Sequence, residues 1–340
     1  MNLRVNRSGR AGGLVAVLLG LGLLASCGGS GTIVEQFVPT RVIALGDETS
    51  VINANGSKFS VNAVLFDGTT TPPTPTTAID CASYPIWIQI VAAHYGLVFP
   101  QCNVLGIAAP TSRIYAVNGA RVADIDAQIN QVLANGGFTN RDMVTILVGA
   151  NDILDQFALY PGVSQAQLEA NLDAAGRALA AQINRLAELG PRILISTTPN
   201  MGRTPFAGSR AIGSNNPNPA VLTALSTAFN TGLLAKITND GHRIGLIQLG
   251  SYLNSVDNAV AAGSTSPFNN STLGACRLTA PLPTCTSQTL VDNSTNVPPP
   301  TVVVTASATT WLWADSFRLS AGGQSSLGSL AVSRATTNPF

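Results

Sequence analysis

The chain has 340 residues, of which 45% are hydrophobic and 10% are charged. This length allows one large domain or two small ones, and the apolar fraction is sufficient for a buried core. Its 18 lysine and arginine residues are balanced by 17 aspartate and glutamate residues, so the basic footprint of a nucleic-acid-binding protein is missing and we expect no nucleic-acid partner.

The first 26 residues are typical of an export signal. Arg4, Arg7 and Arg10 form a positively charged segment at the N-terminus. Residues 11–25 follow as a short apolar stretch, too short to span a bilayer stably. This order of charge and hydrophobicity predicts a signal peptide rather than a membrane helix.

The end of this segment resembles the lipobox of bacterial lipoproteins. The sequence Leu-Ala-Ser-Cys ends at Cys27, and the resemblance implies cleavage before this residue and attachment of lipid to it. Gly28 follows in place of the aspartate that resembles an inner-membrane retention signal, so we expect an anchor in the outer membrane. Residues 27–40 begin rich in glycine and serine and are expected to be a flexible tether. An ordinary cleaved signal with a chance cysteine is the alternative.

Strand and helix patterns alternate along the rest of the chain. In chain order they predict a strand at 41–45, a helix at 84–95, a strand at 113–117, a helix at 121–134, strands at 143–148 and 193–197 on either side of a helix at 164–189, a helix at 222–237, a strand at 244–249 and a last helix at 321–332. The clearest helix starts at a capping box of Ser164 and Gln167 and stops at Gly190-Pro191. Strands that alternate with helices over short connections predict an α/β layer fold with a parallel sheet.

Two polar segments are expected to be exposed loops. Prolines exclude residues 69–77 from a helix interior or a central strand. Residues 263–300 are rich in serine, threonine, asparagine and proline. Trp311 and Trp313 come after the second loop, and core packing explains them as well as ligand stacking does.

Four cysteines remain if Cys27 carries lipid. An even number in an oxidising compartment predicts two disulfides. Pairing by neighbourhood gives Cys81–Cys102 and Cys276–Cys285, and two other connectivities stay open. A zinc site is the rival interpretation, but no cysteine has a close cysteine or histidine partner at ligand spacing. We expect no metal.

The segment after the first strand resembles a known catalytic block. Residues 41–45 run into Gly46-Asp47, and in open α/β sheets the carboxyl end of a strand is where catalytic groups gather. This segment resembles the first block of the SGNH, or GDSL, family of serine esterases and lipases, in which the glycine-aspartate pair precedes the nucleophilic serine. Here the next residue is Glu48.

Later segments resemble the remaining blocks of this family in the same order. Residues 115–120 resemble the second block, which implies that the N–H group of Gly119 is an oxyanion donor. Residues 149–152, Gly-Ala-Asn-Asp, resemble the third block, which implies the same role for the side chain of Asn151. A plain turn glycine and a helix cap are the alternative interpretations of these two residues.

The last block places an aspartate three residues before the catalytic histidine. The segment 311–318 fits this block, with Asp315 in the acid position and Arg318 in place of the histidine. Arginine is a poor general base because it stays protonated. The resemblance covers residues of about 41–332. It implies a single 41–340 domain with a flavodoxin-like three-layer fold.

No other residue is an obvious substitute for the missing nucleophile or base. Thr49 and Ser50 lie close to Glu48, but on a turn that aims one side chain into the site. His94 falls on a predicted helix and His242 in a helix-to-strand turn, away from the carboxyl ends of the strands. We therefore expect both histidines to be ordinary packing or surface residues.

The two replacements carry opposite charges. In the family the serine and histidine side chains touch, so Glu48 and Arg318 are expected to form an ion pair, with Asp315 as a second acceptor for the arginine. Such a pair neutralises the charges buried in the pocket, with a net stabilisation near zero. Independent drift at the two positions is the alternative.

Three functions are compatible with the family resemblance and the replacements at Glu48 and Arg318. The resemblance implies hydrolysis of carboxylic esters without a metal or organic cofactor. The favoured function is a pseudo-esterase with a binding or structural role, which holds an acyl-ester or glycan ligand through Gly119 and Asn151. The second is an active ester hydrolase with an unrecognised nucleophile. The third uses Glu48 and Asp315 as a carboxylate pair of the kind that glycosidases use, but a neighbouring Arg318 would impair the acid role.

Overall fold

The computed structural model describes residues 37–208, 218–238, 241–292 and 305–337. The expected signal peptide (1–26), Cys27 and most of the expected tether lie outside these residues. Within the described part of the chain, no helix combines the length and the hydrophobicity needed to cross a membrane.

A five-stranded parallel sheet forms the centre of the fold. Its strands lie in the order β4-β1-β5-β6-β7, which is the strand order of flavodoxin-like sheets. The strands are β1 (Arg41–Gly46), β4 (Arg113–Ile114), β5 (Asp142–Leu147), β6 (Arg192–Ser196) and β7 (Ile244–Ile247). The chain moves from β1 to one side of the sheet and then returns to the other side, so the strand order reverses between β1 and β5. Ligand and catalytic groups gather at such a reversal point.

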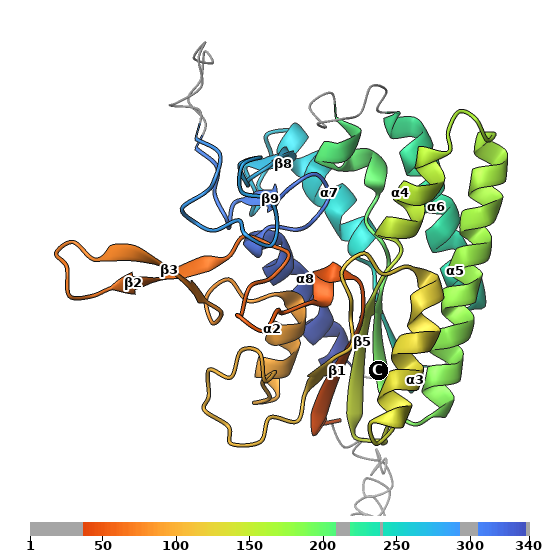
Figure 1. Ribbon diagram of the computed structural model, residues 1–340. Helices are drawn as coiled ribbons and strands as arrows, with labels where there is room; N and C mark the ends of the chain where they lie inside the picture. Colours follow the sequence, from red (N-terminus) through yellow and green to blue (C-terminus); the bar gives the residue numbers. More distant parts are fainter. Residues whose placement is uncertain (1–36, 209–217, 239–240, 293–304, 338–340) are drawn as a thin grey trace, which may run out of the picture. The chain divides into compact units, whose positions relative to one another are not determined.

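Helices cover both faces of this sheet, as Figure 1 shows. The α-helices are α2 (Trp87–His94), α3 (Ile125–Ala134), α4 (Ala150–Ala158), α5 (Gln165–Glu188), α6 (Pro219–Lys236), α7 (Leu249–Ala261) and α8 (Ala321–Thr336). Four short 3-10 helices accompany them: η1 (Glu48–Ser50), η2 (Val122–Asp124), η3 (Met201–Arg203) and η4 (Pro205–Ala207). The expected α/β fold with a parallel sheet is confirmed.

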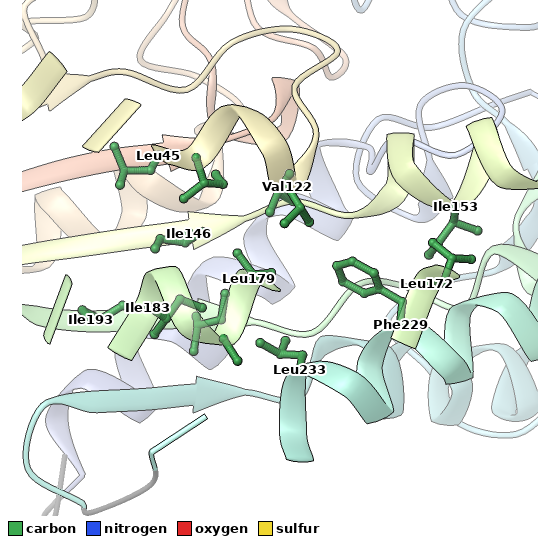
Figure 2. Close-up of a cluster of buried hydrophobic side chains, with 14 of the residues drawn as sticks. Leu45, Val122, Ile146, Ile153, Leu172, Leu179, Ile183, Ile193, Phe229 and Leu233 are labelled. Atoms are coloured by element: carbon green, nitrogen blue, oxygen red, sulfur yellow. The ribbon is translucent and has the colours of Figure 1, made fainter. Parts of the chain in front are cut away.

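Alternation along the central strands divides the core into two layers. Ile43 and Leu45 of β1 face a cluster that includes side chains of α3, α5 and α6, part of which Figure 2 shows. Val42 and Ala44 point to the opposite face, where residues of α2, α7 and α8 pack. Successive side chains of a strand point to opposite faces, so a strand buried on both sides is apolar throughout. This explains why residues 42–45 of β1 form a continuous apolar run and why β5 is apolar apart from Asp142 and Thr145.

Two helices were not expected from the sequence. Helix α4 is separated from β5 by two residues, and its N-cap Gly149 has a φ of +127°, which breaks the strand direction. Helix α7 starts directly after β7 and buries Leu249, Leu253 and Val256, which recur at helical spacing. The signal for α7 was therefore present in the sequence, but the strand expected at 244–249 ran into its first residue.

The two expected loops contain strands. From Thr74 onward the expected 69–77 loop is wrong, because β3 (Thr74–Asp80) pairs antiparallel with β2 (Ala63–Asp67) in a hairpin that projects from the sheet (Figure 1). Pro75 is tolerated because the hairpin has two strands only, so an unpaired edge is available.

The second expected loop is also partly wrong. Strand β8 (Asn270–Gly274) lies within it and pairs in parallel with β9 (Trp311–Trp313), while residues 293–300 lie outside the described part. The expected 113–117 strand shrinks to the two residues of β4, after which the chain turns into the site.

Both expected disulfides are confirmed. Cys81, just after β3, is bonded to Cys102 beyond α2, and Cys276, just after β8, is bonded to Cys285. The first bond ties the hairpin to the loop behind α2, and the second closes the loop beside β8. Covalent closure of such loops reduces the conformational freedom of the unfolded chain.

Candidate active site

The site begins where β1 ends. Gly46 has a φ of +112°, and a Cβ at this position would lie 2.1 Å from the carbonyl oxygen of Leu147 on β5, so only glycine fits. The buried amide of Gln128 on α3 accepts from the N–H of Gly46 at 2.7 Å and donates to its carbonyl at 3.0 Å. This clamp fixes the point at which the chain leaves the sheet and enters η1.

The 3-10 turn η1 then sets the direction of the next side chains. Asp47 caps the turn by accepting a hydrogen bond from the N–H of Thr49 at 2.9 Å. Ser50 is fully buried, and its hydroxyl accepts a hydrogen bond from the indole N–H of Trp87 at 3.1 Å. Its side chain is therefore part of the core packing of α2, while Glu48 points into the site.

The carboxylate of Glu48 is held by three donors from three separate segments. Its Oε2 accepts from the backbone N–H of Gly119 at 2.9 Å and from Nδ2 of Asn151 at 3.1 Å. Its Oε1 accepts from Nε of Arg318 at 2.9 Å. Glu48 is only 1% exposed, so these bonds replace the water that the charged group loses on burial.

Local structure explains how the first two donors meet. Gly119 lies in the turn after β4 with a φ of +77°, and Asn151 lies in the first turn of α4, where it also donates to the carbonyl of Ala120 at 3.1 Å. The neighbouring Asp152 accepts from the N–H of Val122 through both carboxylate oxygens, at 3.1 and 3.2 Å. These bonds join α4 to the segment from Gly119 to η2 and keep both donors on the same atom of Glu48.

Arg318 completes the site from the C-terminal part of the chain. Its Nη1 donates to Oδ2 of Asp315 at 2.6 Å, and its guanidinium group stacks on the ring of Phe317 at 4.3 Å. Oδ1 of Asp315 accepts from the backbone N–H groups of Arg318 and Phe317, which fixes the carboxylate. The predicted Glu48–Arg318 ion pair, with Asp315 as the second acceptor, is confirmed.

The electrostatic environment keeps Glu48 ionised. Burial on its own would raise the pKa of Glu48, but the charge of Arg318 and the bonds from Gly119 and Asn151 outweigh it and hold the pKa below its ordinary value. Burial opposes the charge of Arg318 as well, yet Asp315 and Glu48 raise its pKa. An ionised Glu48 and a protonated Arg318 therefore face each other in the site.

The family model described as GDSL-like Lipase/Acylhydrolase matches residues 92–259. The chain carries a GDSL-like lipase/acylhydrolase domain. The matched segment contains Gly119 and Asn151 and ends before Asp315, whereas Glu48 precedes it. No curated protein matches the chain.

Several solved structures resemble the GDSL-like domain at low identity. An acetyl xylan esterase, AlAXEase, is 14% identical, with 86% of this chain and 98% of that chain covered and a TM-score of 0.43. The lipase Lip_vut3 from a goat rumen metagenome is 14% identical, with 62% of this chain and 81% of that chain covered and a TM-score of 0.39. A lipolytic G-D-S-L family protein from Veillonella parvula is 16% identical, with 64% of this chain and 82% of that chain covered and a TM-score of 0.34.

The two histidines of the GDSL-like domain lie away from its site. His94 is the last residue of α2, and His242 comes just before β7. A helix that connects parallel strands runs opposite to them, so both positions belong to the amino ends of the strands, at the edge opposite Glu48. Among the described residues, no group of three or more histidine, cysteine, aspartate or glutamate side chains is placed to hold a metal ion.

The two tryptophans of the last block belong to the core. Trp311 and Trp313 are each 2% exposed, and the indole N–H of Trp313 donates to the carbonyl of Ser271 at 2.8 Å. Core packing, one of the two explanations that the sequence allowed, therefore accounts for both side chains.

The sequence did not reveal that the carboxylate of Glu48 lies between the N–H group of Gly119 and the side chain of Asn151. The ion pair was predicted because the two positions touch in the family that the sequence resembles and here carry opposite charges. That argument does not place the second carboxylate oxygen of Glu48. The Gln128 clamp was missed as well, although a polar residue inside the apolar stripe of the predicted 121–134 helix was a usable signal. Both features depend on contacts between segments that are far apart in the sequence.

Asp47 provides a test of the electrostatics through pH. Burial first, and then the charge of Glu48, raise the pKa of Asp47 to about 7. A group whose pKa is raised on folding contributes stability that is complete below its unfolded pKa and is lost as the pH rises through its folded pKa.

The variant Asp47→Asn keeps the hydrogen-bond acceptor for the N–H of Thr49 and removes the ionisable group. At about pH 8 we expect the free energy of unfolding of Asp47→Asn to be higher than that of the wild type. The difference should shrink toward about pH 4. Urea unfolding at both pH values measures this, and an equal difference at both would contradict it.

Proposed function

We propose that this protein is a pseudo-esterase, a GDSL-like domain that has exchanged ester hydrolysis for a binding or structural role. The observation that carries the proposal is the contact of a single oxygen, Oε2 of Glu48, with the N–H of Gly119 and the side chain of Asn151. In acyl-transfer enzymes, donors at about 2.7–3.1 Å surround the oxygen that becomes negative in the transition state. Here the bond lengths of 2.9 and 3.1 Å are similar, but the negative oxygen belongs to the protein itself.

The rest of the site supports the same proposal. Ester hydrolysis by this route needs a nucleophile and a base within hydrogen-bond reach. The nucleophile position holds a carboxylate that already accepts three hydrogen bonds, and the base position holds a guanidinium group that stays protonated. Glu48 and Asp315 both bond to Arg318, and the lowered pKa of Glu48 argues against a glycosidase-like acid at this position.

A ligand at this site has to displace Glu48. Gly119 and Asn151 were expected to hold an acyl-ester or glycan ligand, but both donate to Glu48 in this structure. Any such ligand therefore competes with a carboxylate that is already in place. A ligand that binds elsewhere on the domain meets no such competition.

Membrane attachment forms the second part of the proposal. The lipobox at Cys27 and the following Gly28 support a lipid anchor in the outer membrane. Incorporation of labelled palmitate into the wild type and its loss in Cys27→Ala is the expected result, and labelling that persists in the variant would argue against this anchor.

Hydrolysis of p-nitrophenyl acetate and butyrate tests the catalytic part. We expect the wild type to be indistinguishable from buffer, because neither a nucleophile nor a base is available. Asn151→Ala is the control, since it removes one donor and leaves other surface nucleophiles intact. Turnover by the wild type that disappears in Asn151→Ala would show an active ester hydrolase and refute the proposal.

A further inference from the structure

A cavity lies beside the carboxyl ends of β6 and β7, between α6 and α7. Its volume is about 290 Å³, near the lower end of the range for small-ligand pockets. Its lining shares no residue with the Glu48 site. Strands β6 and β7 are the second and third strands from β1, and neighbouring strands lie about 4.8 Å apart, so the cavity is separated from Glu48 by roughly 10 Å or more along the sheet.

The lining of this cavity is polar but uncharged. Among the described residues that line it, all carry amide or hydroxyl side chains except Leu234 and Gly250. A buried anion or cation needs a charged partner, which these residues do not supply. Amides and hydroxyls both donate and accept hydrogen bonds, so the lining suits a neutral ligand that does the same.

Part of this lining already serves the fold. The amide of Asn230 accepts from the N–H of Thr198 at 3.0 Å and donates to its carbonyl at 2.9 Å. The hydroxyl of Ser226 accepts from the N–H of Met201 at 2.9 Å. These residues shape the wall next to β6, and their capacity for a ligand is small.

A second set of lining groups is unused. The side chains of Gln248, Thr231, Ser251 and Asn254 make no hydrogen bond within the described part of the chain, and neither does the amide nitrogen of Asn200. Oδ1 of Asn254 is also buried without a partner. A buried acceptor without a donor costs free energy, so the amide of Asn254 gains from any ligand hydroxyl that reaches it.

We propose that this cavity binds one neutral, multiply hydroxylated unit, such as a hexose. The hydroxyl groups of a sugar donate and accept at several points around a compact ring, which matches the unused amides and hydroxyls. Leu234, which is 46% exposed, offers an apolar surface to the C–H groups of such a ring. No aromatic side chain lines the cavity among the described residues, so a weak dissociation constant of about 1 mM is expected. The inference is independent of whether the Glu48 site hydrolyses esters.

Side-chain amide resonances in a ¹⁵N NMR titration test this inference on the lipid-free chain. The probes are glucose and N-acetylglucosamine, with trialanine as a peptide probe. We expect saturable shifts of the Asn200, Gln248 and Asn254 amides with at least one sugar. The substitution Asn254→Leu should abolish them, and Thr231→Val should weaken binding about 5-fold. The matched control Asn258→Leu lies one turn further along α7, outside the lining, and should bind like the wild type.

Each remaining outcome overturns the inference. Absence of a saturable shift with either sugar excludes a sugar site in this cavity. Shifts that persist in Asn254→Leu, or that are confined to Gly119 and Asn151, place the ligand elsewhere. Tighter binding of trialanine than of both sugars would indicate a peptide site. The spectra themselves report whether each variant is folded.

Discussion

The substitution Glu48→Ser together with Arg318→His is expected to turn this domain into an ester hydrolase. Serine removes the carboxylate from the position between Gly119 and Asn151 and supplies a nucleophile, and histidine supplies the base. Asp315 already reaches the side chain at position 318, where it now bonds to Nη1 of the arginine at 2.6 Å. It is therefore placed to orient the new histidine.

We expect the double variant to hydrolyse p-nitrophenyl acetate at least about 100-fold faster than the wild type, since a positioned base alone contributes this much. Each single variant should stay at background, because it lacks either the base or the nucleophile. Adding Asn151→Ala to the double variant should remove about 100-fold or more of the gained rate, the usual cost of one oxyanion donor. A folded double variant without activity would show that these residues are not arranged as an esterase site.

Removal of the arginine charge is expected to have the largest effect on stability. In Arg318→Met the carboxylate of Glu48 stays 1% exposed but loses its only ionic partner among the described residues. Breaking a buried pair on one side costs about 3–5 kcal/mol, and the 23% exposure of Arg318 places the expected loss near 3 kcal/mol at neutral pH. Arg177→Met is the matched control. The side chains of this ion pair, Arg177 and Asp173, are 42% and 34% exposed, so a much smaller loss than in Arg318→Met is expected.

The loss should depend on pH with a defined sign. The folded-state pKa of Glu48 is lowered in the wild type, so its contribution is present above the unfolded pKa and disappears as the pH falls through the folded value. Without Arg318, burial dominates and raises the folded pKa of Glu48. The deficit of Arg318→Met should therefore be largest at neutral pH and shrink in acid. Urea unfolding across this range measures it, and a deficit that does not change with pH would show that Arg318 acts by packing alone.

Much of the sheet was predictable because each strand carries its own signal. β1 and β5 are buried on both faces and consist mostly of apolar residues, and α5 is capped by Ser164 and followed by a glycine-proline stop. Helices α4 and α7 were not predicted, since no more than two residues separate each from the end of the preceding strand. The β2–β3 hairpin was missed because proline is a reliable breaker in central strands but not at an unpaired edge.

The site was predictable as a set of residues but not as an arrangement. Residue types and their order identified Glu48, Gly119, Asn151, Asp315 and Arg318. Opposite charges at the two exchanged positions were sufficient to predict the ion pair. The position of the second oxygen of Glu48 depends on where the turn after β4 and the first turn of α4 meet, which only the folded chain determines.

The amide resonance of Gly119 is the most direct test of the central claim, that Glu48 occupies the oxyanion position. It is followed by ¹⁵N NMR in the wild type and in Glu48→Ala while formate is added. We predict that formate leaves the wild-type resonance unchanged, since the donor is already bonded to Glu48. In Glu48→Ala the resonance should start elsewhere and move, with saturation, toward its wild-type position as formate enters the vacated site. The same starting position in both proteins, without a response to formate in either, would show that Glu48 does not occupy this position.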